Sequence, residues 1–177
     1  GRGGTITVQN RGDIRISGTR DDPTQKDPVT GNALTLPSGF FANSGGAGNA
    51  GGIVISTANL SVLSGGEVSS TAQRGSLGRG GSVTIRATGL VRVDGSTATA
   101  NGPKSSGIVA NTFSAGDAGS LDVSADRIEV SNDGRIQSQT QSSGNAGSIR
   151  LRARQVALSS GGQVATSTFD RVNGGNG

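Results

Sequence analysis

The sequence predicts an all-β protein: a right-handed parallel β-helix (β-solenoid) of about five coils, each made of three short strands, with two loop insertions. Two observations lead to this prediction. A glycine-rich segment recurs along the chain, and after each copy apolar and polar residues alternate with the period of two that is typical of strands. The spacing between copies becomes nearly constant once the two insertions are removed. We therefore expect residues 1–177 to form one repeat region.

The recurring glycine-rich segment places the start of the five coils near residues 4, 51, 81, 119 and 147, at intervals of 47, 30, 38 and 28 residues. Insertions at 18–38 and 95–105 lengthen the first and third intervals by 19 and 10 residues. Without them the intervals are 28, 30, 28 and 28 residues. Such a register is typical of stacked repeats and is not expected of a disordered chain.

Three apolar columns define the strands of each coil. The first column contains Ile6/Val8, Ile53/Ile55, Val83/Ile85, Leu121/Val123 and Ile149/Leu151. The second begins five or six residues later and contains Ile14/Ile16, Leu60/Val62, Val91/Val93, Ile128/Val130 and Val156/Leu158. The third is expected two residues after a glycine, at Phe41, Val68, Val109, Ile136 and Val164. The inward position that follows it would then hold a ladder of small polar side chains, at Asn43, Ser70, Asn111, Ser138 and Thr166.

A unit of three short strands cannot bury its own apolar face, so each coil must stack on its neighbours. Parallel strands from successive coils then lie about 4.8 Å apart, and the crossover rule makes the winding right-handed. The stacking predicts two charge pairs between coils, Arg92 beside Glu129 and Asp122 beside Arg150. All four prolines lie in the insertions, which predicts loops that leave the stack at one corner.

The composition excludes most site chemistry. The chain has no Cys or His, so it has no thiol nucleophile, no imidazole base and no zinc site of the usual kind. Asp94, Asp117 and Asp133 fall in different columns and predict no calcium ladder. We expect no catalytic residue, no cofactor and no metal.

The charge pattern also limits the expected partners. The net charge is +4, but the basic residues are scattered and no Trp or Tyr is present to stack on bases, so we expect no nucleic acid. No apolar run is long enough for a transmembrane segment. The sequence contains no Met, and we expect it to be a fragment of a longer rod.

Arg11-Gly12-Asp13 is the one candidate attachment motif, because this tripeptide occurs in adhesive proteins. It directly precedes the inward Ile14, so the alternative interpretation is an ordinary bend at the entry to a strand. Arg150, Arg152 and Arg154 form a second basic feature, which is either a solvated face or a contact for an acidic glycan.

The segments Gly116–Val123 (GDAGSLDV) and Gly144–Leu151 (GNAGSIRL) carry a family resemblance. In these repeated Gly-x-Ala-Gly-Ser segments the chain resembles the filamentous haemagglutinin-like exoproteins, above all their Gly/Asn/Ala-rich members of cyanobacterial type. The resemblance implies a right-handed parallel β-helix that a Gram-negative type bacterium exports by two-partner secretion, through an outer-membrane transporter. The family's amino-terminal secretion domain is not in this sequence. The absence of Cys fits a chain that crosses an oxidising periplasm unfolded.

The expected function is that of a non-catalytic structural or adhesive segment of a secreted or surface-exposed adhesin. Its partner would be a host-cell, neighbouring-cell or glycan surface, contacted by the insertions, because loops carry function more often than coil corners do. The sequence does not distinguish an adhesin from a structural spacer that binds no ligand. The alternative is a carbohydrate-active β-helix enzyme or glycan-binding module, since such proteins share the architecture and fold alone does not decide function.

Overall fold

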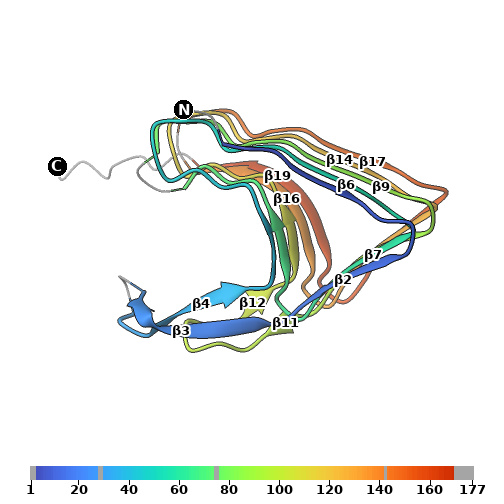
Figure 1. Cartoon of the computed structure of the whole chain (residues 1–177), viewed down its shortest axis with the longest axis horizontal. Coiled ribbons are helices and arrows are strands. Elements are labelled where there is room, and N and C mark those ends of the chain that lie inside the picture. Colours follow the sequence, from blue (N-terminus) through green and yellow to red (C-terminus); the bar gives the residue numbers. More distant parts are fainter. Residues whose placement is uncertain (1–2, 28–29, 74–75, 142, 170–177) are drawn as a thin grey trace.

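The computed structural model describes residues 3–27, 30–73, 76–141 and 143–169, and in these ranges the protein is all-β, without a helix. Three five-stranded sheets are parallel throughout, and two small sheets are antiparallel hairpins (Figure 1). The chain passes through the three parallel sheets in turn and then returns to the first. Each of the five repeats contributes one strand to each of them.

The strands of the parallel sheets follow the order of the repeats. The first sheet contains β1 (Ile6–Gln9), β6 (Ile53–Thr57), β9 (Val83–Ala87), β14 (Leu121–Ser124) and β17 (Ile149–Arg152). The second contains β2 (Asp13–Ser17), β7 (Asn59–Leu63), β10 (Leu90–Asp94), β15 (Arg127–Ser131) and β18 (Gln155–Leu158). The third contains β5 (Gly39–Phe41), β8 (Glu67–Ser69), β13 (Gly107–Val109), β16 (Arg135–Thr140) and β19 (Gln163–Thr168).

The strand register confirms the first two predicted columns. In the first sheet, Ile6 pairs with Ile53, Ile53 with Val83, Val83 with Leu121 and Leu121 with Ile149. The second sheet pairs its inward residues in the same way. Alternate residues of the central strands are buried, and their branched side chains form one continuous apolar core between the sheets.

The third column was predicted one residue too late in two repeats. Phe40 and Ile108, not Phe41 and Val109, align with the buried Val68, and Ile108 is fully buried. The cause is Gly39, which occupies the outward strand position that Glu67 holds in the next repeat. A Cβ at Gly39 would lie 1.7 Å from the Glu67 carbonyl oxygen, so the close approach of the backbones requires glycine here.

The polar ladder shifts with the column. Asn43 and Asn111 face outward, and the inward positions of their repeats are the buried Ala42 and Ala110. Ser138 does point inward as predicted, and its hydroxyl donates to the Gly119 carbonyl oxygen at 2.7 Å. Ser70 makes the equivalent bond to the Gly51 carbonyl oxygen. The inward serines thus satisfy carbonyl groups of the glycine-rich segments, which would otherwise be buried without a partner.

Both insertions leave the stack between the second and third sheets, as predicted, but they form β-hairpins and not loops. The first consists of β3 (Thr19–Lys26) and β4 (Ala33–Pro37), and the second of β11 (Ser96–Thr97) and β12 (Lys104–Ser105). A register irregularity between Asp22 and Lys26 accommodates Pro23 within a strand, because this part of the ladder does not need its missing N–H. Pro23 therefore lies at a register irregularity, and Pro37 ends β4 opposite Thr19.

The predicted charge pairs align in register, but their ion pairs differ in part. Arg92 stands opposite Glu129, yet each pairs within its own strand, Arg92 with Asp94 at 3.2 Å and Glu129 with Arg127 at 2.7 Å. Asp122 lies opposite Arg150 at 4.0 Å, and a shorter bond of 2.8 Å joins it to Arg152.

Candidate functional site

The two hairpins pack against each other at their outer ends, although about 70 residues separate them in sequence (Figure 1). The Thr30 hydroxyl donates to the Asn101 side-chain oxygen at 2.5 Å, and the Asn101 amide donates to the Ala33 carbonyl oxygen at 2.8 Å. The Asn32 amide donates to the Ala100 carbonyl oxygen at 2.9 Å. These bonds make the hairpins one projecting unit, which we call the hairpin platform (residues 19–27, 30–37 and 96–105).

The hairpin platform straddles the second repeat, whose own corner is short. Gly65 at this corner has φ +83°, and a Cβ there would lie 2.8 Å from a methyl carbon of Thr19. The Gly65 N–H donates to the Ser106 hydroxyl at 3.0 Å, and the Thr97 hydroxyl donates to the Ser64 carbonyl oxygen at 2.7 Å. A glycine corner in the middle repeat thus lets hairpins from the first and third repeats approach each other.

A cleft of about 550 Å³ lies between the hairpin platform and the outer face of the third sheet. An adjoining hollow of about 340 Å³ extends it along that face. The lining is mixed, with aromatic, amide and charged side chains: Arg20, Leu36, Pro37, Phe41, Asn43, Glu67, Gln73 and Lys104 in the cleft, and Ser69, Thr71, Val109, Asn111, Phe113 and Gln137 in the hollow. We call the two together the platform cleft.

An ion pair between Lys104 and Glu67 ties the hairpin platform to the third sheet in the floor of this cleft. Glu67 lies largely buried at the start of β8, and Lys104 comes from β12. Because the pair fixes a hairpin strand against the sheet, the cleft has a defined width and is not a gap between independent segments.

Aromatic and amide groups face the platform cleft. Phe41 is 38% exposed, which is high for an aromatic side chain. The side-chain oxygens of Asn43 and Asn111 each accept a backbone N–H of the next repeat at 2.9 Å, from Thr71 and Gln139. Their amide nitrogens donate to no group among the described residues, so they are available to a ligand. An apolar ring beside amide donors is the combination that binds the faces and hydroxyl groups of sugars.

Arg11, Gly12 and Asp13 are all exposed and lie where the chain enters β2. The Asn10 side-chain oxygen accepts the Gly12 N–H at 3.3 Å, and its amide donates to the Asp13 carbonyl oxygen at 3.0 Å, so the motif forms an Asx-type bend. The Asp13 carboxylate accepts a hydrogen bond from the Asn59 amide at 2.8 Å. Use of the tripeptide as an attachment motif stays a prediction.

Three carboxylates of the stack, among them Asp94 and Asp117 from the sequence analysis, accept hydrogen bonds from neighbouring groups. Hydrogen bonds from Ser131 at 2.6 Å and Asn132 at 2.7 Å lower the pKa of Asp94. A hydrogen bond from the backbone N–H of Asn145 lowers the pKa of Asp117, and a hydrogen bond from the Arg154 guanidinium lowers the pKa of Asp126. These groups are therefore ionised at neutral pH and are not disposed to act as general acids. No group of three or more acidic side chains within the described ranges could hold a metal ion.

Sequence reasoning missed the platform cleft. One feature of the sequence could have indicated it. The two insertions occur at the same corner of the first and third repeats, so they must leave the stack only two strand spacings apart, close enough to contact each other. The outward orientation of Phe41 followed only from the corrected register.

No protein-family model, curated protein or solved structure matches the chain. In the part of the chain that the structure describes, no helix is long and apolar enough to cross a membrane.

Proposed function

We propose that the chain is a repeat region of a right-handed parallel β-helix that belongs to a secreted or surface-exposed, haemagglutinin-like adhesin. Three parallel sheets, visited in turn by every repeat and paired in register from repeat to repeat, support the β-helix. The handedness rests on the crossover rule. The export route, two-partner secretion across the outer membrane, rests on the resemblance of the Gly-x-Ala-Gly-Ser segments to the haemagglutinin-like exoproteins.

The single observation that carries an adhesive function is the hairpin platform beside an aromatic cleft. A plain spacer needs only the three-residue corner that the fourth repeat has, Asn132 to Gly134. Here two repeats instead carry long hairpins that hydrogen-bond to each other and to the stack. The stacked sheets would provide reach, and the platform would contact a host-cell, neighbouring-cell or glycan surface.

A non-catalytic role is supported by the ion pairs and hydrogen bonds that hold three of the carboxylates. Glu67 pairs with Lys104, Asp94 with Ser131 and Arg92, and Asp126 with Arg154, so each has a partner that serves the stack. A second candidate function, a glycan-binding module, is favoured by Phe41, Phe113 and the free amide nitrogens of Asn43 and Asn111 in the cleft. The two functions are compatible, because a glycan is one of the surfaces that an adhesin contacts.

The experiment is adhesion of protein-coated beads to cells. Residues 18–38 are replaced by Ser-Gly-Gly, the native corner of the second repeat, which connects the same two sheet positions. The proposal predicts that the wild-type chain attaches beads, that the shortened chain attaches several-fold fewer, and that both give the same far-UV circular dichroism per residue. Equal attachment by the two folded proteins would refute the role of the platform, and no attachment by the wild type would refute adhesion.

A further inference from the structure

The corner between the first and second sheets has a recess at the second repeat. Residues 10–12 connect β1 to β2 in the first repeat and residues 88–89 connect β9 to β10 in the third, whereas Ala58 alone connects β6 to β7 in the second. The shorter connection lies between two longer ones. The result is a groove of about 630 Å³, whose floor consists of small side chains.

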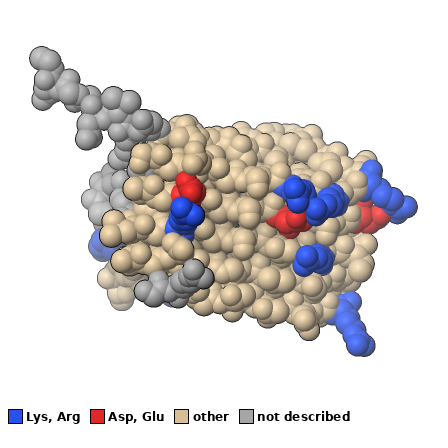
Figure 2. Space-filling model, turned by 90° about the horizontal axis from the view of Figure 1, so that it is seen from above, with Lys and Arg blue, Asp and Glu red and all other residues tan. Residues whose placement is uncertain are grey.

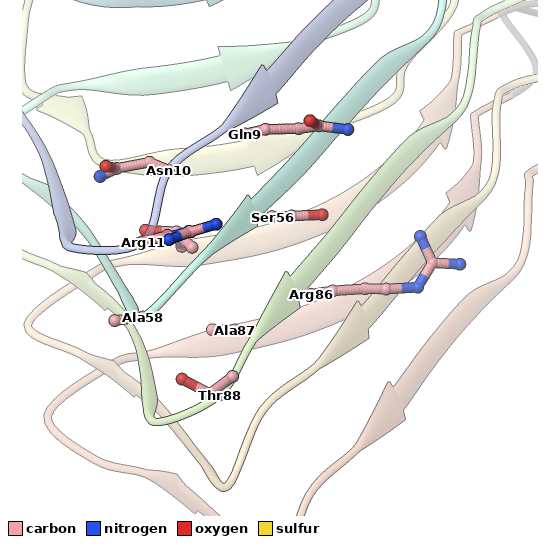
Figure 3. Close-up of a pocket in the computed structure, with 9 residues that line it drawn as sticks. Gln9, Asn10, Arg11, Ser56, Ala58, Arg86, Ala87 and Thr88 are labelled. Atoms are coloured by element: carbon pink, nitrogen blue, oxygen red, sulfur yellow. The ribbon is translucent and has the colours of Figure 1, made fainter.

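The groove carries positive charge only. Arg11 from the first repeat and Arg86 from the third line it, together with neutral residues such as Gln9, Ser56 and Thr88. Gln9, Ser56 and Arg86 extend to the same side from three neighbouring strands (Figure 3). Both arginines are exposed, and neither forms an ion pair within the described residues. The nearby Asp13 carboxylate is bonded to Asn59 on the second sheet and does not line the groove.

The same column continues across the outer face of the first sheet. Its register runs Gln9, Ser56, Arg86, Ser124 and Arg152, so serines alternate with arginines in its second to fifth positions. Arg150 and Arg152 share one carboxylate, Asp122, which leaves one positive charge uncompensated. Figure 2, which looks onto this face, shows most of its basic side chains in one half, with a few acidic side chains among them.

Cationic groups occur in this column at the third and fifth repeats, and in the first repeat Arg11 lies at the corner, two residues after Gln9. Neighbouring strands are about 4.8 Å apart, so these groups are spaced by about 10 Å along the stack. We call Arg11, Arg86 and the Arg150/Arg152 pair the arginine row. Ser56 and Ser124 offer hydroxyl groups between them.

We propose that the arginine row binds a linear acidic polysaccharide that carries about one carboxylate or sulfate per disaccharide, laid across the repeats. A disaccharide of such a polymer is about as long as the two strand spacings between successive cations. The serine hydroxyls would face the uncharged sugar between two acidic ones. A nucleic acid fits less well, because each strand carries a phosphate on every nucleotide, more densely than one cation per about 10 Å, and no aromatic side chain in the row could stack on a base.

The test measures binding of the 177-residue chain to four immobilised polymers: hyaluronan, whose acid is a carboxylate; keratan sulfate, whose acid is a sulfate; dextran, which is neutral; and single-stranded DNA. Binding to hyaluronan or keratan sulfate is expected, which also identifies the acid. Salt should weaken it, because the arginines are exposed. Arg86→Ser, which copies Ser56 and Ser124, should lower the affinity about two- to fivefold, and Arg11→Ser with Arg86→Ser by the product of the two effects.

Arg135→Ser is the matched control. Arg135 starts β16 on the third sheet, forms no ion pair with any described residue and carries the same charge, so its loss should leave the affinity unchanged. An equal loss in Arg135→Ser and Arg86→Ser would overturn the proposal, since it would show a response to net charge alone. Failure to bind either acidic glycan, equal binding of dextran, or tighter binding of DNA through the same arginines would also overturn it. Circular dichroism of each variant confirms that it is folded.

This proposal concerns a different face from the platform cleft and does not depend on it. Replacement of the first hairpin should leave binding to the acidic glycan unchanged, so the failure of one proposal is distinguishable from the failure of the other.

Discussion

Truncation of two adjacent residues, Ile108 and Val109, distinguishes the observed register of the third sheet from the one that glycine spacing predicts. Ile108 is fully buried in the core between Val68 and Ile136, whereas Val109 faces the platform cleft. Ile108→Ala removes three carbon atoms from a closed core. At about 0.8 kcal/mol per buried carbon this costs about 2.4 kcal/mol, and the cavity left behind raises the cost to about 3 kcal/mol.

Val109→Ala removes two methyl groups from a side chain that already borders the cleft, so water fills the space and we expect a cost of about 1 kcal/mol or less. The assay is urea unfolding followed by far-UV circular dichroism, because the chain has neither Trp nor Tyr for fluorescence. With an m-value of about 2 kcal/mol/M, the midpoint should fall by about 1.5 M for Ile108→Ala and by less than about 0.5 M for Val109→Ala. An equal or larger shift for Val109→Ala would refute the register.

Three further results are expected. Asn101→Ala removes two bonds to the first hairpin, one to Thr30 in its turn and one to Ala33 in β4. Hydrogen exchange of the β3 and β4 amides should therefore accelerate about fivefold or more while exchange in the three parallel sheets stays unchanged; uniform acceleration would contradict a separate platform. Gly65→Ala places a Cβ at positive φ and against Thr19, so unfolding should become easier by at least about 1 kcal/mol, whereas Gly46→Ala, where a Cβ meets nothing, should have little effect in the same urea titration. Hydrogen bonds lower the pKa of Asp94 in the folded protein, so the ionised carboxylate stabilises the fold fully above its pKa in the unfolded chain, about 3.9, and this contribution is lost as the pH falls through the folded-state pKa. The urea midpoint of Asp94→Asn should therefore fall less on acidification than that of the wild type. Plots of midpoint against pH that run parallel for the two proteins would contradict this.

The first two strand columns were predictable because β-branched residues alternate cleanly there and no residue interrupts them. The third column was predictable only in repeats where the marker glycine precedes the strand. Gly39 and Gly107 lie inside the strand, and a marker that moves by one residue turns every following side chain to the opposite face. This is why Phe41 and Val109 were expected to point into the core and instead line the cleft, Phe41 exposed and Val109 at its edge with 8% of its surface exposed.

The insertion boundaries were also predictable, but the hairpins were not. Proline lacks the N–H that strand pairing uses, so the prolines predicted loops. The register irregularity beside Pro23 instead lets β3 pair with β4 on either side of it. Packing of one hairpin on the other depends on Asn101 meeting Thr30 and Ala33 across two repeats, and no local pattern encodes that contact. The arginine row has the same origin, because Arg11 and Arg86 lie near each other only through strand register.

The most direct test of the proposed export is protease shaving of intact source cells followed by detection with an antibody to residues 19–37. If the chain belongs to an exported adhesin, the antigen is cut from intact cells or is found in the medium, while a cytoplasmic marker stays protected. If the antigen is protected until the cells are broken open, export is contradicted; the register of the strands would stand, but its use in adhesion would not.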